Sequence, residues 1–247
     1  MAEQRRDGRR ADQLRPIAIR RGYLNTVPGS VLFEMGQTRV VCTVSIEDRV
    51  PPFLVGTGRG WLTAEYGMLP GSSAKRIARE SSTGRPNGRT QEVQRLIGRS
   101  LRSVMDLGTV GVRTFYVDCD VLQADGGTRT ASITGGYVAL AEAVARLLKD
   151  GVLERNPLRE AVAAVSVGVV AGRVLLDLCY DEDSRAETDM NVVMTAGGGI
   201  VEVQGTAEGT PFSRSQAEAM MDLASRGIGE LLDRQLADAA PPVDGAA

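Results

Sequence analysis

The sequence predicts a mixed α/β fold in which sheets and packed helices form one compact domain. Along the 247 residues, strand-like and helix-like segments follow in the order strands, helices, strands, helix. The chain is 43% hydrophobic, which suffices for a full core in one domain or two closely packed halves, and no linker interrupts the body. We therefore predict one domain over residues 1–238 and a disordered Pro/Ala/Gly-rich tail over 239–247.

The first part of the chain is expected to contain four strands and two helices. Alternating β-branched runs predict strands over residues 30–36, 39–46, 59–66 and 114–122. Only a short turn separates the first two runs, so they are expected to pair as a hairpin. Apolar residues at helical spacing predict a helix over 90–107 with arginines outside its buried face. A second helix is predicted over 130–149, where small residues would allow close approach to a sheet.

The second part is expected to contain two hairpins and a final helix. Further strands are predicted over residues 162–170, 173–180, 190–194 and 200–203. They pair as two hairpins, the first about Ala171 and Gly172 and the second about three consecutive glycines. In the final helix, Ser213 and Gln216 have the spacing of a capping box, and an apolar stripe is expected to face the core.

The composition excludes several classes of chemistry. The chain has no histidine, which excludes Ser-His and Cys-His mechanisms and leaves carboxylates, Tyr, Lys, a metal ion or a bound phosphate to move protons. Cys42, Cys119 and Cys179 lie in apolar runs without CxxC spacing, so reduced thiols are expected rather than disulfides or a zinc site. We see neither an export signal nor a membrane-length apolar run, and expect a cytoplasmic protein with no membrane partner.

Charge is distributed unevenly although the net charge is only −2. Residues 71–105 are strongly cationic, whereas residues 177–190 are mainly acidic. A cationic surface beside an acidic pocket suits a polyanionic substrate. Solvated charged faces would give the same pattern.

A phosphate site is predicted where the strand 114–122 gives way to a helix. The sequence Asp-Gly-Gly-Thr-Arg-Thr at 125–130 places backbone amides and Arg129 at a helix start, where an anion is favoured. Arg89 is expected to meet Arg129 around one inorganic phosphate, with Thr128 donating a hydrogen bond. A plain tight turn would also need Gly126 and Gly127.

The second candidate site is the pair Asp183 and Asp189, six residues apart in the sequence YDEDSRAETDMN. Two carboxylates flanked by strand-forming residues offer a hard-cation site or an acid and base next to the anion. A turn residue and a solvated strand-edge charge would have the same spacing. Together the two candidate sites favour phosphoryl transfer.

Four sequence blocks resemble those of the bacterial ribonuclease PH family. They are NGRTQEVQRLIGRSLR, DCDVLQADGGTRTASITG, EDSRAETDMNVVMT and VEVQGTAEGTPF, and the resemblance runs from RRDGRRADQLRP to the last helix. It implies a compact α/β fold and a phosphate-dependent 3′-to-5′ exoribonuclease that trims tRNA precursors and other RNA 3′ ends. Such an enzyme releases nucleoside diphosphates and can run in reverse as a nucleotidyltransferase.

The resemblance also implies site residues, cofactors and partners. The phosphate-binding positions fall on Arg89, Gly127, Thr128 and Arg129, and the catalytic ones on Asp183 and Asp189. Inorganic phosphate would be the co-substrate and Mg²⁺ would support activity. From the residues themselves we expect both aspartates to bind Mg²⁺ and one of the two, with Asp189 favoured over Asp183, to protonate the departing oxygen. Homodimers would assemble into a hexameric ring.

The chain departs from the family pattern at Gly71, where many members have an arginine that binds the tRNA body. Arg76 and Arg79 keep the later basic positions and, with Arg99, are expected to bind the RNA backbone or to stabilise subunit contacts. Two other functions are considered. One is a non-catalytic RNA-binding subunit of an exosome-like ring, and the other is a hydrolytic nuclease that uses water and releases monophosphates.

Overall fold

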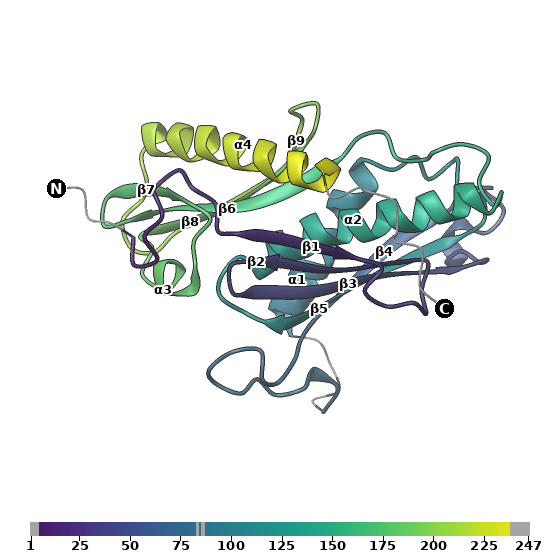
Figure 1. The fold of residues 1–247 in the computed structure, drawn as a ribbon, viewed down its shortest axis with the longest axis horizontal. Helices are drawn as coiled ribbons and strands as arrows, with labels where there is room; N and C mark the ends of the chain where they lie inside the picture. Colours follow the sequence, from purple (N-terminus) through teal and green to yellow (C-terminus); the bar gives the residue numbers. More distant parts are fainter. Residues whose placement is uncertain (1–4, 83, 85–86, 238–247) are drawn as a thin grey trace.

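The computed structural model describes residues 5–82, 84 and 87–237, so the predicted tail over 239–247 lies outside the described residues. Its secondary structure confirms the predicted mixed α/β fold. Two sheets and four α-helices pack in layers in the described part of the chain (Figure 1).

The first sheet has five strands in the order β1-β2-β3-β5-β4. They are β1 (Ile17–Arg21), β2 (Gly29–Met35), β3 (Thr38–Glu47), β4 (Trp61–Met68) and β5 (Thr114–Gln123). Neighbouring strands are antiparallel except β4 and β5, which run parallel with α1 (Gly88–Ser103) between them in sequence. Strand β1 was not predicted, because its five residues are too few for a clear alternation.

The second sheet is antiparallel, with the strand order β7-β6-β8-β9. Its members are β6 (Val162–Val170), β7 (Arg173–Leu176), β8 (Thr188–Thr195) and β9 (Ile200–Ala207). The strand predicted over 173–180 is wrong beyond Leu176. There Asp177 adopts a left-handed backbone with φ 52°, and the short helix α3 (Tyr180–Asp183) follows. A strand cannot continue through a residue in that conformation.

The layers are held together by α2 (Thr128–Lys149), which contacts β2 and β3 of the first sheet and β6 of the second. Helix α1 packs beside it against β4, and α4 (Arg214–Ala237) covers the other face of the second sheet (Figure 1). The predicted capping box of α4 is confirmed. The Ser213 amide donates to Gln216 Oε1 at 2.8 Å, and the Gln216 amide donates to Ser213 Oγ at 3.2 Å.

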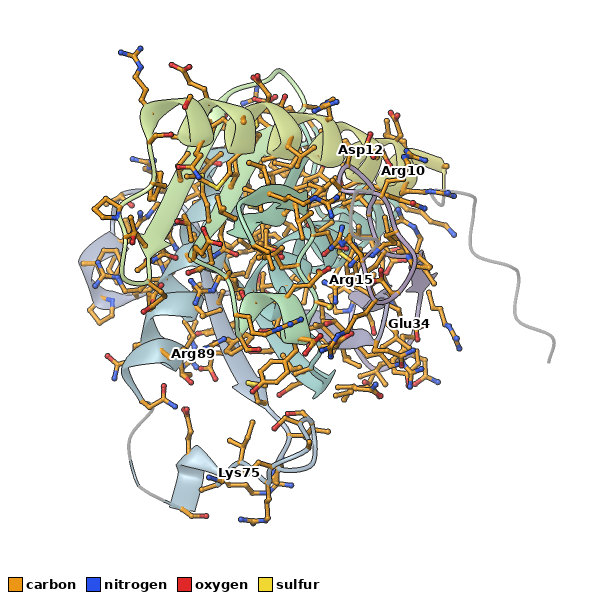
Figure 2. All side chains as sticks on the ribbon, turned by 90° about the vertical axis from the view of Figure 1, so that its left-hand side faces the viewer. Arg10, Asp12, Arg15, Glu34, Lys75 and Arg89 are labelled. Carbon is orange, nitrogen blue, oxygen red and sulfur yellow. The ribbon has the colours of Figure 1, made fainter. Side chains whose placement is uncertain are left out.

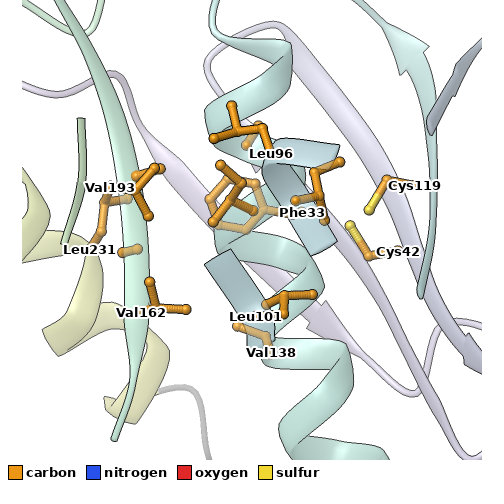
Figure 3. Packing of buried hydrophobic residues seen from close by; sticks show 14 of the residues in the cluster. Phe33, Cys42, Leu96, Leu101, Cys119, Val138, Val162, Val193 and Leu231 are labelled. Atoms are coloured by element: carbon orange, nitrogen blue, oxygen red, sulfur yellow. The ribbon is translucent and has the colours of Figure 1, made fainter. Parts of the chain in front are cut away.

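One continuous hydrophobic core joins both sheets with α1, α2 and α4 (Figure 3). Phe33 of β2 and Gly135 of α2 show how closely the layers approach, because a Cβ atom at Gly135 would lie 2.7 Å from the Phe33 Cβ. Cys42 and Cys119 are buried neighbours on β3 and β5, and together with Cys179 they are free thiols, as predicted.

Helix α2 also has the length and mean hydropathy of a membrane-spanning segment, contrary to the expectation that no stretch of the chain reaches them. Most of that segment is buried between the two sheets. Its apolar composition therefore serves the core of the fold.

Candidate active site

All six residues predicted for the phosphate and carboxylate sites line one cavity of about 600 Å³. They are Arg89, Gly127, Thr128, Arg129, Asp183 and Asp189. These residues come from the start of α1, the turn between β5 and α2, the end of α3 and the start of β8. The cavity thus lies where elements of the first and second halves of the chain meet.

The turn between β5 and α2 places a helix N-terminus at the cavity. Gly126 and Gly127 have φ of 73° and 63°, and Gly127 immediately precedes the first residue of α2. This left-handed pair reverses the chain so that the helix begins at the cavity wall. The helix start offers unpaired N–H groups and a positive dipole end, which favour an anion.

Thr128, the first residue of α2, is buried and its hydroxyl lies 2.8 Å from the Tyr66 hydroxyl. Burial raises the pKa of Tyr66, so its phenol stays protonated and can donate to Thr128. A hydroxyl that accepts this bond still has its own proton to donate. When Tyr66 donates in this bond, the Thr128 proton is free for an anion in the cavity. The sequence prediction did not include Tyr66, which is distant in sequence and has no motif of its own.

Arg129 is held by two other elements. Its Nη1 donates to Gln204 Oε1 of β9 at 2.7 Å and to Glu92 Oε1 of α1 at 3.4 Å. Gln204 also donates to Glu92 at 2.6 Å, so the three side chains form a closed set. Neither Gln204 nor Glu92 was predicted as a site residue from the sequence. Gln204 lies inside the block VEVQGTAEGTPF, and this block is the sequence feature that could have indicated it.

Arg89 is the second residue of α1, whose N-cap is Asn87. The Asn87 side chain accepts from the Thr90 amide at 2.9 Å and fixes the start of the helix. Within the described residues no carboxylate forms an ion pair with Arg89, whereas Arg129 is paired with Glu92. The Arg89 guanidinium is thus available to an anion in the cavity.

The two aspartates face this positive end of the cavity. Asp183 remains accessible to solvent and Asp189 is half-buried. Partial desolvation, and then the charge of Asp189, raise the pKa of Asp183. The charges of Arg89, Arg129 and Arg15 act in the opposite direction, which places all three near the same carboxylate.

The donor set of the aspartate pair fits Mg²⁺. The described residues contain no group of three or more acidic, cysteine or histidine side chains arranged around a metal position. Mg²⁺ usually takes one or two protein carboxylates and completes its shell with water and substrate oxygens. Asp183 and Asp189 would supply such a pair.

The residues predicted to bind RNA lie outside the cavity. Arg76 and Arg79 are exposed in the loop between β4 and α1, which projects below the body around Lys75 (Figure 2). Glu80 of this loop accepts from Asn87 Nδ2 at 2.6 Å and so ties the loop to the start of α1. Arg99 is exposed on α1 and pairs with Glu202 of β9 at 2.6 Å.

Comparison with family models gives matches over most of the chain. Residues 13–145 match the model described as 3′ exoribonuclease family, domain 1. Residues 160–227 match the model described as domain 2 of that family. The first matched segment ends within the last part of α2, and the second begins just before β6.

Solved structures with a similar fold cover nearly the whole chain. Rice (Oryza sativa) Rrp46 superposes with a TM-score of 0.77 and 19% identity, covering 95% of this chain and 99% of Rrp46. A chain of the Archaeoglobus fulgidus exosome with RNA bound to the active site gives a TM-score of 0.78 and 22% identity, covering 94% of this chain and 92% of its own. A chain of an archaeal exosome core gives 0.72 and 20%, covering 94% and 91%. At these identities the likeness concerns the fold.

Proposed function

Because the chain belongs to the 3′ exoribonuclease family, we propose that it is a phosphorolytic enzyme that shortens RNA from the 3′ end, as bacterial ribonuclease PH does. The observation that carries this proposal is the composition of the cavity. One side has a helix N-terminus with Arg89 and Arg129, which suits inorganic phosphate, and the other side has two carboxylates.

The reaction would be an in-line displacement. An oxygen of inorganic phosphate, held by Arg89, Thr128 and the start of α2, attacks the phosphorus of the last RNA linkage. A new P–O bond forms as the bond to the 3′ oxygen of the preceding nucleotide breaks, which releases a nucleoside diphosphate. The guanidinium groups neutralise charge and align the phosphate, so positioning supplies most of the rate.

The carboxylates of Asp183 and Asp189 would act at the departing 3′ oxygen. Asp183 and Asp189 would hold Mg²⁺, which when bound supplies positive charge beside the phosphate oxygens. Asp189 is our candidate for the residue that takes up the proton of the attacking hydrogen phosphate and passes it to the departing 3′ oxygen, which leaves as a hydroxyl group. The reverse reaction, nucleotide addition from a diphosphate, follows from microscopic reversibility at the same residues.

We further propose tRNA precursors as substrates, a cytoplasmic location and a homohexameric ring. The resemblance to bacterial ribonuclease PH supports all three. The similar chains from the Archaeoglobus fulgidus exosome with RNA bound and from an archaeal exosome core support an assembly of subunits and an RNA partner. Light scattering of the purified protein distinguishes a hexamer from smaller assemblies.

A second candidate is a non-catalytic RNA-binding ring subunit. The similarity to Rrp46 and the exosome chains is compatible with this function. The presence of both arginines and both aspartates in one cavity favours catalysis. A hydrolytic nuclease would have no use for an arginine-lined phosphate pocket.

The deciding experiment incubates the protein with a 3′-extended tRNA and Mg²⁺, with and without inorganic phosphate, and identifies the released nucleotides. We expect nucleoside diphosphates only when phosphate is present. Asp189→Asn should abolish release and retain RNA binding. Monophosphates formed without phosphate would favour hydrolysis, and RNA binding without products would favour the non-catalytic subunit.

A further inference from the structure

Outside the cavity, the N-terminal segment buries a group of charged side chains behind the proposed site. Arg5, Arg15, Asp177 and Glu182 have side-chain exposures of 2%, 3%, 1% and 9%. None of the four lines the cavity. Buried charges are costly unless paired, and hydrophobic residues of similar volume would often stabilise a fold as well. Their role therefore needs an explanation beyond stability.

Arg5 fixes the helix that carries Asp183. Its Nε and Nη2 donate to the two carboxylate oxygens of Glu182 at 2.7 and 2.6 Å. Arg5 Nη1 also donates to the carbonyl of Leu176 at 2.8 Å. Glu182 in turn accepts from the Cys179 amide at 3.1 Å, which caps the start of α3. Because Glu182 directly precedes Asp183, this bidentate pair sets the orientation of the short helix.

Arg15 fixes the turn that starts α2. Its Nε and Nη2 donate to the Asp177 carboxylate at 2.9 and 2.7 Å. The same guanidinium donates to the carbonyl of Asp125 and, at 3.4 Å, to that of Gly126. A Cβ atom at Gly127 would lie 3.1 Å from Arg15 Nη2, so the guanidinium is packed under the turn.

Asp177 connects these two sets of contacts, which we call the Arg5 arm and the Arg15 arm. Its carbonyl accepts from Arg5 Nη2 at 2.9 Å and its carboxylate accepts from Arg15. Asp177 also has a left-handed backbone, a conformation that a non-glycine residue keeps only where its surroundings impose it. The chain between Asp177 and Asp183 thus starts from a fixed point.

We propose that these four residues, Arg5, Arg15, Asp177 and Glu182, form a positioning brace for both halves of the active site. The Arg15 arm places the turn at Gly126 and Gly127, which we call the phosphate turn, and the Arg5 arm places the helix that ends at Asp183. The inference rests on the proposed function for its kinetic consequences. The brace itself is defined by contacts that do not depend on turnover.

The two arms predict different kinetic defects. A lysine keeps the charge of arginine and cannot form its planar fork, so Arg15→Lys and Arg5→Lys each loosen one arm. Arg15→Lys should raise the KM for inorganic phosphate roughly tenfold with little change in kcat. Arg5→Lys should lower kcat roughly tenfold with little change in that KM. Arg10→Lys is the matched control, because Arg10 lies in the same segment and pairs with the exposed Asp12.

Two further variants, one binding measurement and one hydrogen-exchange measurement keep the test independent of folding and of turnover. Thr38→Val removes a hydroxyl that donates to the Gly126 carbonyl at 2.7 Å and should reproduce the phosphate defect. Glu182→Gln should reproduce the kcat defect. Calorimetry measures binding of inorganic phosphate directly, and amide hydrogen exchange measures opening of residues 180–184.

The outcomes separate the brace from the proposed function. If the wild-type protein releases no diphosphates, the proposed function fails. The brace still stands if Arg15→Lys weakens phosphate binding, Arg5→Lys speeds exchange at 180–184, and Arg10→Lys does neither. If the arm variants behave like Arg10→Lys, the brace is wrong. Equal losses of kcat, phosphate affinity and stability in both arms would also overturn it, because they indicate a general structural role.

Discussion

At the scale of single residues, the junction of the phosphate turn with α3 depends on Gly126. A Cβ atom at this position would lie 2.5 Å from the Leu178 carbonyl and 2.9 Å from the Tyr180 amide nitrogen. The left-handed backbone of Gly126 adds a second requirement for glycine. The turn and the entry to α3 therefore meet backbone to backbone, with no room for a side chain.

Gly126→Ala should consequently lower the free energy of unfolding by about 2 to 5 kcal/mol, from the clash and the left-handed backbone together. Gly172→Ala is the control, because Gly172 has φ 70° and nothing within 4 Å of a Cβ position. It should cost only about 1 to 2 kcal/mol. Urea unfolding of both variants measures the difference. Equal losses would show that the contact with α3 relaxes at no cost.

Gly71 illustrates a position where an added side chain is tolerated. A Cβ atom at Gly71 would meet nothing within 4 Å, and the residue is exposed in the loop that carries Arg76 and Arg79. Gly71→Arg should strengthen RNA binding at low salt. It should also steepen the slope of the logarithm of the RNA association constant against the logarithm of the salt concentration by about 0.7. Binding titrations over a range of salt concentrations test this.

The control for Gly71→Arg is Gly229→Arg, which adds the same charge on α4, where a Cβ position is equally open. Its salt slope should match the wild-type slope. If the two variants behave alike, net charge rather than the loop governs RNA binding, and the RNA-binding role of Arg76 and Arg79 loses its support.

At the scale of elements, α3 shows how a very short helix is kept in place. Four residues are too few for a stable isolated helix, so its capping and ion pairs decide its stability. Burial disfavours the charged form of Glu182, yet the hydrogen bonds and charge of Arg5 outweigh burial and hold the pKa of Glu182 below its usual value. The helix is therefore linked to pH.

A carboxyl group with a lowered folded-state pKa stabilises the protein above its unfolded pKa of about 4.3. That contribution is lost as pH falls through the folded-state pKa. The wild-type melting temperature should therefore drop more steeply than that of Glu182→Gln between about pH 5 and pH 3. Thermal unfolding across this range gives both curves, and parallel curves would contradict the linkage.

The helices and strands also show which parts of the fold can be predicted from the sequence alone. Local signals gave correct results where they were strong, as in the capping box of Ser213 and Gln216 and the hairpin about Ala171 and Gly172. The end of β7 and the helix α3 could not be predicted. They depend on Asp177, whose conformation is associated with contacts to Arg15, 162 residues away in the chain.

The same distinction holds for the candidate site. The six predicted residues among those that line the cavity carry recognisable chemistry in compact motifs, so they could be selected as candidates from the sequence. Tyr66, Glu92 and Gln204 act through their contacts with Thr128 and Arg129, and only the fold brings them there. The sequence also could not show that Arg76 and Arg79 lie in a loop away from the cavity.

At the scale of the whole molecule, the two segments that match the family models share one core. Adjacent residues of α2 contact opposite sheets. Gly135 packs on Phe33 of the first sheet, and Thr134 Oγ1 accepts from the Ala164 amide of the second at 3.1 Å. Gln235 of α4 adds a bond to the Thr134 carbonyl at 3.2 Å. Neither half can lose α2 without exposing a sheet face.

We therefore expect the molecule to unfold as one cooperative unit. Trp61, the one tryptophan of the chain, lies in β4 and reports on the first sheet, while circular dichroism reports on all elements. Ile228→Ala removes a buried side chain on α4, beyond the second sheet, and should lower the free energy of unfolding by about 2 to 5 kcal/mol. Because the core is shared, the Trp61 fluorescence transition should move to a lower denaturant concentration together with the circular dichroism transition.

The control is Leu236→Ala, at an exposed position on the same helix, which should shift neither of the two transitions. A Trp61 transition that stays in place while circular dichroism shifts would mean that the two halves unfold separately.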